Sequence, residues 1–440
     1  MTKPQRQAVE SEGWDRIPEI LRNIRQPVFP DTEFQISDYG ASNDGVSDST
    51  QAIQLAIDAC SKAGGGRVTI AAGVWLSRAI RLRTGVNLHL CDGAVIKFSP
   101  DARAYLPAVQ SRWEGTELFN YASLIYAVDE SNMAITGRGV IDGQADADNW
   151  WRWDELLRSQ GKYSARNTLH EMNQTKAPIA ARHFGEGHFL RPNLITFFRC
   201  ANILVEDVTL TRSPMWHLHP LESKNITIRR TRFEASGPNT DGCNPESCDG
   251  VLIESCHFNT GNDCIAIKSG RHHDGRKRAI PSQSIVIRQC RMQDGHGAIT
   301  LGSELAGGIR DVYVEDCFMN SSNLRCAIRI KGNPSKGGWL DRFYCRRIVV
   351  SKVAMSVLDL NFAYEENAEG RDMPYVSNLV ISDLKAAQYS QILKIQGADN
   401  ASLSGLVLQD CTFQQEAEGI SDMSIFGLKN VTVGDQRYDA

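Results

Sequence analysis

Five residues in the middle of the sequence are of types that could carry out acid–base chemistry on a negatively charged ligand. They lie in short polar segments: Asp241 in PNTDGCNP, Asp263 in TGNDC, His296 in DGHG, and Arg329 and Lys331 in IRIKG. Carboxylates and imidazole can transfer protons, and arginine and lysine bind anions. Each aspartate alone also suits a tight turn, so the chemical interpretation depends on a fold that brings the five together.

A recurring phrase of alternating apolar and polar residues predicts such a fold. It reads ANILVEDVTL, KNITIRRTRF, DGVLIESCHF and so on to KNVTV, and an earlier copy begins near Met133. The first apolar residues of the copies, spaced 23 to 36 residues apart, are Ile203, Ile226, Val251, Ile285, Val312, Phe343, Leu379, Leu406 and Val431. Alternation with period two is typical of strands, and we expect no crossover helices between the copies. The sequence therefore predicts an all-β, single-domain parallel β-helix in which each copy is one coil.

Equivalent positions on successive coils of such a solenoid are neighbours about 4.8 Å apart. Asp241 lies 15 residues after the first apolar residue of its copy, Asp263 lies 12 after, His296 lies 11 after, and Arg329 and Lys331 lie 17 and 19 after. These similar offsets predict that four consecutive coils present the five side chains on one face. Two carboxylates, a histidine and two cations in one column would form a hydrolytic site for an anionic substrate.

Four of the twelve cysteines fit the same repeat. Five residues after the first apolar residue, successive copies carry Val208, Thr231, Cys256, Cys290, Cys317, Ile348, Leu384 and Cys411. Cysteine in this position acts as a small hydrophobic residue of a buried ladder. Because paired C-x-x-C spacing is lacking, we expect neither a metal site nor a cofactor.

The N-terminal part follows a different pattern. Asp48 or Ser49 is an N-cap candidate for a helix of about four turns that ends at the glycines 64–66, with apolar residues at Ile53, Leu55, Ala56 and Ala59. We interpret residues 1–66 as a segment whose helix caps the open end of the solenoid, and residues 67–440 as the β-helix.

Charge and composition narrow the class of partner. The formal net charge of −4 excludes the broad positive field that non-specific nucleic-acid binding needs. No stretch reaches the roughly 18 uncharged apolar residues of a membrane span, and the first residues lack the apolar core of a secretory signal. We expect a cytoplasmic protein, or a secreted or periplasmic one if a leader has been removed, that binds neither nucleic acid nor membrane. The oligomeric state stays open.

The order of four motifs resembles the family 28 glycoside hydrolases, the polygalacturonases, and especially their bacterial branch. The motifs are NTD, GNDCIAIKSG, GHG followed by GSE, and RIK, and the resemblance runs from about Asp38 to about Tyr375. It implies a right-handed parallel β-helix and inverting hydrolysis of α-1,4-linked galacturonate in pectic oligosaccharides. In that chemistry a carboxylic acid protonates the leaving oxygen while carboxylates opposite activate water.

The resemblance also implies a role for each matching residue. Asp241 and Asp263 match the two base positions, and His296 matches the histidine beside the acid. Arg329 and Lys331 match the pair that holds a substrate carboxylate. Further substrate-binding positions match Asn239, Lys268 and Glu304.

Asn262 departs from the family pattern, because it stands where the family places the general acid. An amide has no proton to give at neutral pH, and general acid catalysis typically contributes about 10² to 10⁴-fold in rate. Three explanations stay open: an engineered Asp-to-Asn variant that traps substrate, a natural subgroup with its acid elsewhere, and a galacturonate-binding protein derived from an enzyme.

Other activities fit the same solenoid. A hydrolase of a decorated pectin such as rhamnogalacturonan is one alternative. Pectate lyases use calcium held by clustered acids, whereas here the acids lie a coil apart beside a histidine.

A loop insertion at about residues 145–187 interrupts the repeat. Insertions at this place in the family shape one end of the cleft, so we expect exo action. We expect the tryptophans of this segment to pack within the protein rather than stack on sugars; they are Trp150, Trp151 and Trp153. Further along, Tyr364 resembles a cleft tyrosine.

Overall fold

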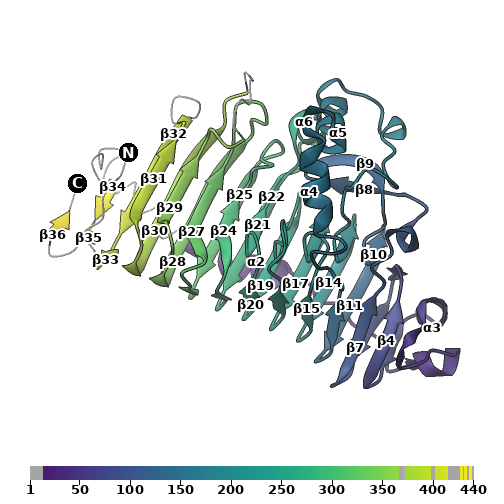
Figure 1. The fold of residues 1–440 in the computed structure, drawn as a ribbon. Helices are drawn as coiled ribbons and strands as arrows, with labels where there is room; N and C mark the ends of the chain where they lie inside the picture. Colours follow the sequence, from purple (N-terminus) through teal and green to yellow (C-terminus); the bar gives the residue numbers. More distant parts are fainter. Residues whose placement is uncertain are drawn as a thin grey trace. The chain divides into compact units, whose positions relative to one another are not determined.

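The computed structural model describes residues 13–365, 370, 372–397, 402–414, 427–429, 431–433 and 436–438. The predicted segments 1–66 and 67–440 therefore include residues outside the described ones, among them 1–12 and 439–440. The chain divides into two compact units. We call residues 25–246 and 259–262 the early unit, and residues 1–24, 247–258 and 263–440 the late unit. Both consist of coils of parallel strands, and the chain has the right-handed parallel β-helix fold predicted from the sequence (Figure 1).

In the early unit, three series of parallel strands form the faces of the coils. The first is β1 Glu33–Gln35, β3 Gly66–Ile70, β6 Val86–Leu90, β11 Ser131–Gly137, β14 Ala201–Glu206 and β17 Lys224–Arg229. The second is β2 Asp44–Asp48, β4 Gly73–Ser77, β7 Ala94–Phe98, β12 Val140–Asp142, β15 Thr209–Thr211 and β18 Arg232–Glu234. The third is β5 Ile80–Arg81, β10 Ile125–Val128, β13 Ile195–Phe198 and β16 Leu218–Leu221. An antiparallel hairpin adds β8 Val109–Trp113 and β9 Thr116–Asn120.

The late unit repeats this plan. One series is β19 Asp249–Glu254, β22 Ser282–Arg288, β25 Ile309–Glu315, β28 Trp339–Lys352, β30 Tyr375–Gln388, β32 Ser402–Gln409 and β34 Gly427–Lys429. A short series holds β20 His257–Asn259, β23 Arg291–Met292, β26 Phe318–Asn320, β33 Thr412–Phe413 and β35 Val431–Val433, in which β26 pairs with the end of β28 and β33 with the end of β30. The last strand, β36 Gln436–Tyr438, runs antiparallel to β35. The series that carries most of the predicted site is β21 Ile265–Ile267, β24 Gly295–Leu301, β27 Leu324–Lys331, β29 Ser356–Asn361 and β31 Gln391–Gln396.

The strand register confirms the repeat. Ile203 pairs with Ile226 in the early unit, and in the late unit five successive pairings link Val251 through Leu406. The position of Val431 is wrong, because β35 pairs with β33 and not with β32, so the last copy is shifted along the coil. The ladder position is confirmed, since every residue in it from Val208 to Cys411 is at most 2% exposed.

The predicted cap helix is α3, Thr50–Lys62, which begins after Ser49 as N-cap. Its buried side chains are Ala52, Ile53, Ala56, Ile57 and Cys60. Leu55, one of the apolar residues of the predicted helix, lies on the opposite side of it and is 48% exposed. Hydrogen bonds from Gln54 to the Arg81 carbonyl and from Ser61 to the Thr84 carbonyl attach α3 to the first coils of the early unit.

The expectation of coils without helices is also wrong. The 145–187 insertion contains α4 Arg152–Ser159 and α5 Ala165–Gln174, and the late unit contains α6 His272–Arg278 between β21 and β22. Short helical turns occur at η1 Ile36–Tyr39, η2 Ala102–Tyr105, η3 Gly161–Tyr163 and η4 Ile179–Ala181. Within the early unit α4 and α5 share an apolar cluster with the β8–β9 hairpin, which includes Leu157, Leu169, Trp113 and Leu118 (Figure 1).

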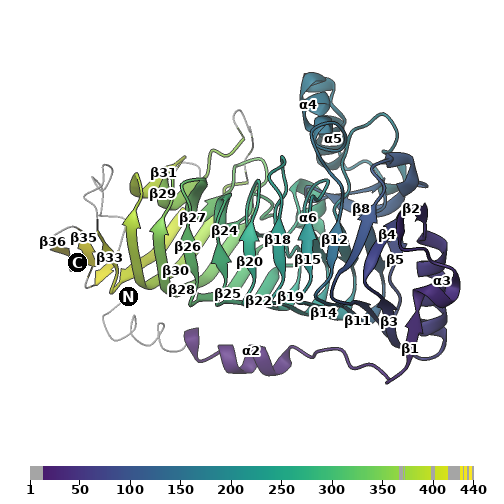
Figure 2. The same ribbon diagram turned by 60° about the horizontal axis from the view of Figure 1, so that its bottom comes forward.

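A helix that the sequence analysis missed covers outward-facing residues of the late unit. It is α2, Ile17–Asn23, drawn below strands β19 to β28 in Figure 2. Ile17, Ile20 and Ile24 form a cluster with Leu252, Val286, Tyr313, Tyr344 and Val380. Burial of apolar area there keeps an exposed hydrophobic stripe away from water. Among the described residues no helix has the length and apolar character of a membrane span.

Candidate active site

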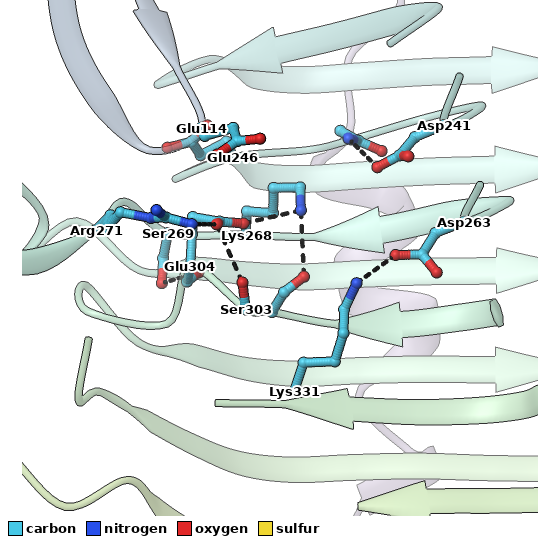
Figure 3. A network of polar contacts seen from close by, with 12 residues as sticks. Glu114, Asp241, Glu246, Asp263, Lys268, Ser269, Arg271, Ser303, Glu304 and Lys331 are labelled. Atoms are coloured by element: carbon cyan, nitrogen blue, oxygen red, sulfur yellow. Dashed lines mark hydrogen bonds and ion pairs between the residues drawn. The ribbon is translucent and has the colours of Figure 1, made fainter. Parts of the chain in front are cut away.

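In the early unit, Asp241 is held by two amides. The aspartate, which is labelled in Figure 3, is 1% exposed. Its Oδ1 accepts a hydrogen bond from Asn262 Nδ2 at 2.7 Å, and its Oδ2 accepts one from Asn244 Nδ2 at 2.8 Å. Its backbone carbonyl accepts hydrogen bonds from the backbone N–H and the Nδ1 of His217. Burial lowers the pKa of His217 to about 4, so this imidazole is neutral at neutral pH and donates from Nδ1.

The turn that carries Asn262 is fixed by a close backbone approach. A Cβ at Gly261 would lie 2.2 Å from the Gly237 carbonyl oxygen, so only glycine fits this position. The Gly261 N–H donates to Thr240 Oγ1, and Thr260 Oγ1 donates to the Asn262 carbonyl. Asn262 is half-buried, in contrast to the buried Asp241 that it contacts. The amide of Asn262 is thus held in position and is partly accessible.

Asn239 lies in the same segment and contacts a buried arginine. Arg191 Nη2 donates to Asn239 Oδ1 at 2.6 Å and to Asp154 Oδ1 at 3.2 Å, and its Nη1 donates to the carbonyls of Pro214 and Pro238. One guanidinium therefore joins the segment before Asp241 to helix α4. Arg191 stands outside the four motifs that carry the resemblance.

In the late unit, Asp263 is paired with cations. Its side chain is fully buried, and Lys331 Nζ lies 2.6 Å from Oδ2 (Figure 3). Arg329 Nη1 lies 3.9 Å from Oδ1. Burial alone raises the pKa of Asp263, but the charges of Lys331 and Arg329 outweigh it and bring the pKa to about 2. Arg329 Nε also donates to Asp359 Oδ2 at 3.2 Å. Asp263 is therefore ionised throughout the neutral range.

Strand register brings Arg329 and Lys331 to Asp263. Ile265 in β21 pairs with Ile299 in β24, which pairs with Ile328 in β27, so these isoleucines point inward together. Arg329 and Lys331 alternate with the inward residues and point to the other side. A Cβ at Gly297, in β24, would lie 3.1 Å from Asp263 Oδ1 and 2.3 Å from Thr300 Oγ1. Glycine at 297 therefore leaves room for the aspartate.

His296 precedes that glycine in β24 and is half-buried. Burial is the main cause that lowers the pKa of His296 to about 4, and the charge of Arg325 lowers it further. Asp263 acts in the opposite direction. Since the shift leaves the imidazole neutral above about pH 4, His296 can exchange hydrogen bonds with a ligand without presenting a positive charge.

Lys268 and Glu304 are paired with each other inside the late unit. Lys268 Nζ lies 2.9 Å from Glu304 Oε2, and both side chains are at most 5% exposed. Arg271 Nη2 lies 2.9 Å from Glu304 Oε1, and Lys336 Nζ lies 3.7 Å from the same oxygen. These cations keep the pKa of Glu304 well below its usual range despite its burial. Sequence reasoning missed Arg271 and Lys336, which occupy irregular segments without a periodic pattern.

The structure thus places the predicted residues in two clusters. Asn239, Asp241 and Asn262 belong to the early unit, whereas the late unit holds Asp263, Lys268, His296, Glu304, Arg329 and Lys331. Asn262 and Asp263 are consecutive residues joined by one peptide bond. Among the described residues no group of three His, Cys, Asp or Glu side chains is arranged to hold a metal ion.

The tryptophans of the insertion are engaged in packing. Trp150 is 1% exposed and makes edge contacts with Tyr105, Tyr121 and Trp153. The indole of Trp151 donates to the Ser213 carbonyl at 3.0 Å. These contacts favour a role in holding the helical insertion rather than a sugar-stacking role.

Comparisons with known proteins agree with this arrangement of motifs. The family model described as "Glycosyl hydrolases family 28" matches residues 183–434. A "Probable polygalacturonase" of Vitis vinifera is 29% identical over 87% of this chain and 74% of its own length, and an "Exo-poly-alpha-D-galacturonosidase" of Dickeya chrysanthemi is 27% identical over 90% and 73%. The solved structure of a hyperthermoactive exopolygalacturonase from Thermotoga maritima is 36% identical, covers 97% of both chains and superposes with a TM-score of 0.88.

Proposed function

This chain belongs to glycosyl hydrolase family 28 and is a glycosidase of the polygalacturonase type. From that premise we propose that it hydrolyses α-1,4-linked galacturonate from chain ends and with inversion. Full activity would require a carboxylic acid at position 262. The roles follow the family motifs. Asp241 and Asp263 supply the carboxylates that activate water, Arg329 and Lys331 hold a substrate carboxylate, and His296 supports the acid.

The hydrogen bond between Asn262 and Asp241 carries this proposal. A carboxyl group at position 262 would lie within hydrogen-bond distance of Asp241, and two carboxylates this close cannot both ionise at neutral pH. One proton would be shared between them, and the half-buried residue 262 could deliver it to a leaving oxygen. The amide of Asn262 makes the same contact but has no proton to release. The chain as it stands would bind galacturonate and turn it over very slowly.

The decisive experiment is the Asn262→Asp variant. We expect release of reducing ends from trigalacturonate to increase about 10² to 10⁴-fold. Asn244→Asp is a matched control, because it adds a carboxyl group against the other oxygen of Asp241 at a fully buried position that no substrate reaches. If Asn262→Asp hydrolyses trigalacturonate no faster than the parent chain, position 262 is not the acid. Tight binding without turnover in both variants would favour a galacturonate-binding protein.

We propose exo action, that is, release of short products from the ends of the polygalacturonate chain. The helical insertion with α4 and α5 is joined by Arg191 to the segment that carries Asp241, and two relatives are named as exo-acting enzymes. We expect the Asn262→Asp variant to release only one short product from polygalacturonate, measured by chromatography. A spread of intermediate lengths at early times would contradict this, and preferential cleavage of rhamnogalacturonan would change the substrate assignment.

A cytoplasmic location is the remaining part of the proposal. None of the twelve cysteines, all of which are among the described residues, forms a disulfide, and burial raises the pKa of several of them, including Cys290 and Cys345. Buried thiols without disulfides suit a reducing compartment. Fractionation of cells that produce the chain tests this, and recovery from the medium or periplasm would contradict it.

A further inference from the structure

Glu365 bridges two buried cations of the late unit. Its Oε1 lies 3.3 Å from Arg271 Nη2, and its Oε2 lies 3.0 Å from Lys336 Nζ. The side chains of Arg271 and Lys336 are each 1% exposed, whereas that of Glu365 is 33% exposed. The carboxylate of Glu365 is therefore the part of this group that meets solvent.

The charges around it favour an anion at this position. Glu304 is in contact with Lys268, Arg271 and Lys336, so with Glu365 the cluster contains three cations and two carboxylates. Removal of Glu365 would take a negative charge away from two cations whose side chains are buried, which is unfavourable. Burial and the neighbouring Arg271 already lower the pKa of Lys336 to about 8. A carboxylate from a ligand could replace Glu365 with little loss of free energy, because it would restore the negative charge beside Arg271 and Lys336.

The residue before Glu365 connects this cluster to the pair that is assigned to a substrate carboxylate. The centroid of the Tyr364 ring lies 5.1 Å from Lys331 Nζ, 5.4 Å from Lys336 Nζ and 5.6 Å from the Arg329 guanidinium carbon. Asn333 supports both sides, since its Nδ2 donates to the Tyr364 carbonyl and its Oδ1 accepts from the Lys336 N–H. The Tyr364 ring thus lies near both cationic groups, Lys331 with Arg329 and Lys336 with Arg271, and Asn333 holds Tyr364 and Lys336 in place.

Resting on the proposed function, we infer that Arg271 and Lys336 form a second uronate-carboxylate position, which Glu365 fills in the free protein and the carboxylate of a further sugar residue fills in the complex. The fork of Arg271 suits a carboxylate, and Lys336 adds a point charge. Glu365 then acts as an internal competitor. Removal of the Glu365 carboxylate should therefore strengthen the binding of a ligand with several carboxylates, even though the ion pairs of Glu365 with Arg271 and Lys336 are lost.

Calorimetric titration of the parent chain and the Glu365→Gln variant with trigalacturonate tests this. We expect the variant to bind roughly threefold to tenfold more tightly, because the competing contact is worth about as much as a partly exposed ion pair. Lys336→Met should weaken binding by about tenfold or more. Glu254→Gln is the matched control, since it removes the same charge and breaks the Arg288–Glu254 pair on a different strand series; its affinity should equal that of the parent chain.

Unchanged or weaker binding in Glu365→Gln would overturn the inference and make Glu365 a support for the two cations. Parent-like affinity in a folded Lys336→Met would overturn it as well. These results leave the proposed function intact, because trigalacturonate would still bind. Absence of trigalacturonate binding in every variant, together with an inactive Asn262→Asp, would instead contradict the proposed function itself.

Discussion

Asp241 and Asp263 are two buried aspartates to which the family motifs give the same role, yet their partners differ in charge. Asp241 accepts hydrogen bonds from the neutral amides Asn262 and Asn244, whereas Asp263 is paired with Lys331 and lies beside Arg329. Because Lys331 and Arg329 keep Asp263 ionised, this carboxylate can accept a proton or supply a negative charge, but it has no proton to donate. Neutral donors leave Asp241 able to share a proton with a carboxyl group at 262. The comparison shows that burial alone does not determine whether an aspartate can share a proton; the charge of its hydrogen-bonding partners does.

Replacement of Asp263 by asparagine should have the largest effect on stability. Asp263→Asn removes the charge that neutralises Lys331 and leaves a buried ammonium group without its partner. Breaking a buried ion pair in this way typically costs about 3–5 kcal/mol. The measurement is the free energy of unfolding from urea titration at pH 7. A cost below about 1 kcal/mol would mean that water or Asp359 compensates Lys331 and that the two aspartates do not differ as described.

The pH dependence of stability should differ between the parent chain and Asp263→Asn. The pKa of Asp263 falls from the ordinary 3.8 to about 2 in the folded state, so its contribution is complete above about pH 4 and is lost as the pH falls towards 2. By linkage this shift corresponds to about 2 kcal/mol. We expect the stability difference between the two proteins to shrink by about that amount between pH 5 and pH 2. A constant difference over this range would show that Asp263 has an ordinary pKa.

The strand register explains why part of this picture could be predicted. Parallel pairing repeats the same inward and outward positions, so the first apolar residues, the cysteine ladder and the offsets of Arg329 and Lys331 were readable from the sequence. Arg271, Lys336 and Arg191 stand in irregular segments, where no period exists to reveal them. The offsets also could not show that Lys268 and Glu304 are each other's partners, because pairing depends on side-chain direction. Leu55 is apolar yet exposed, because residues two positions apart on a helix, such as Ile53 and Leu55, point to nearly opposite sides.

Gly297 tests how tightly the cationic site is built. In Gly297→Ala the new Cβ would lie 2.3 Å from Thr300 Oγ1 and 3.1 Å from Asp263 Oδ1, so the strand or these side chains must shift. Overpacking of this kind typically costs about 1–3 kcal/mol, and in an active Asn262→Asp background it should also lower kcat. Gly185→Ala is the control, because its Cβ would meet only Leu106 at 3.6 Å. Equal effects of the two variants would show that the space beside Asp263 is not restricted.

The smallest effect is expected at the amide-paired aspartate. Asp241→Asn exchanges one oxygen for an NH₂ group but can keep an oxygen towards either Asn262 or Asn244, and both of these side chains are uncharged. The loss is the difference between a charged and a neutral hydrogen bond, about 1 kcal/mol. Urea titration beside Asp263→Asn measures the contrast directly. If Asp241→Asn proves as destabilising as Asp263→Asn, Asp241 carries charge compensation that its amide partners do not reveal, and a shared proton with residue 262 loses its physical basis.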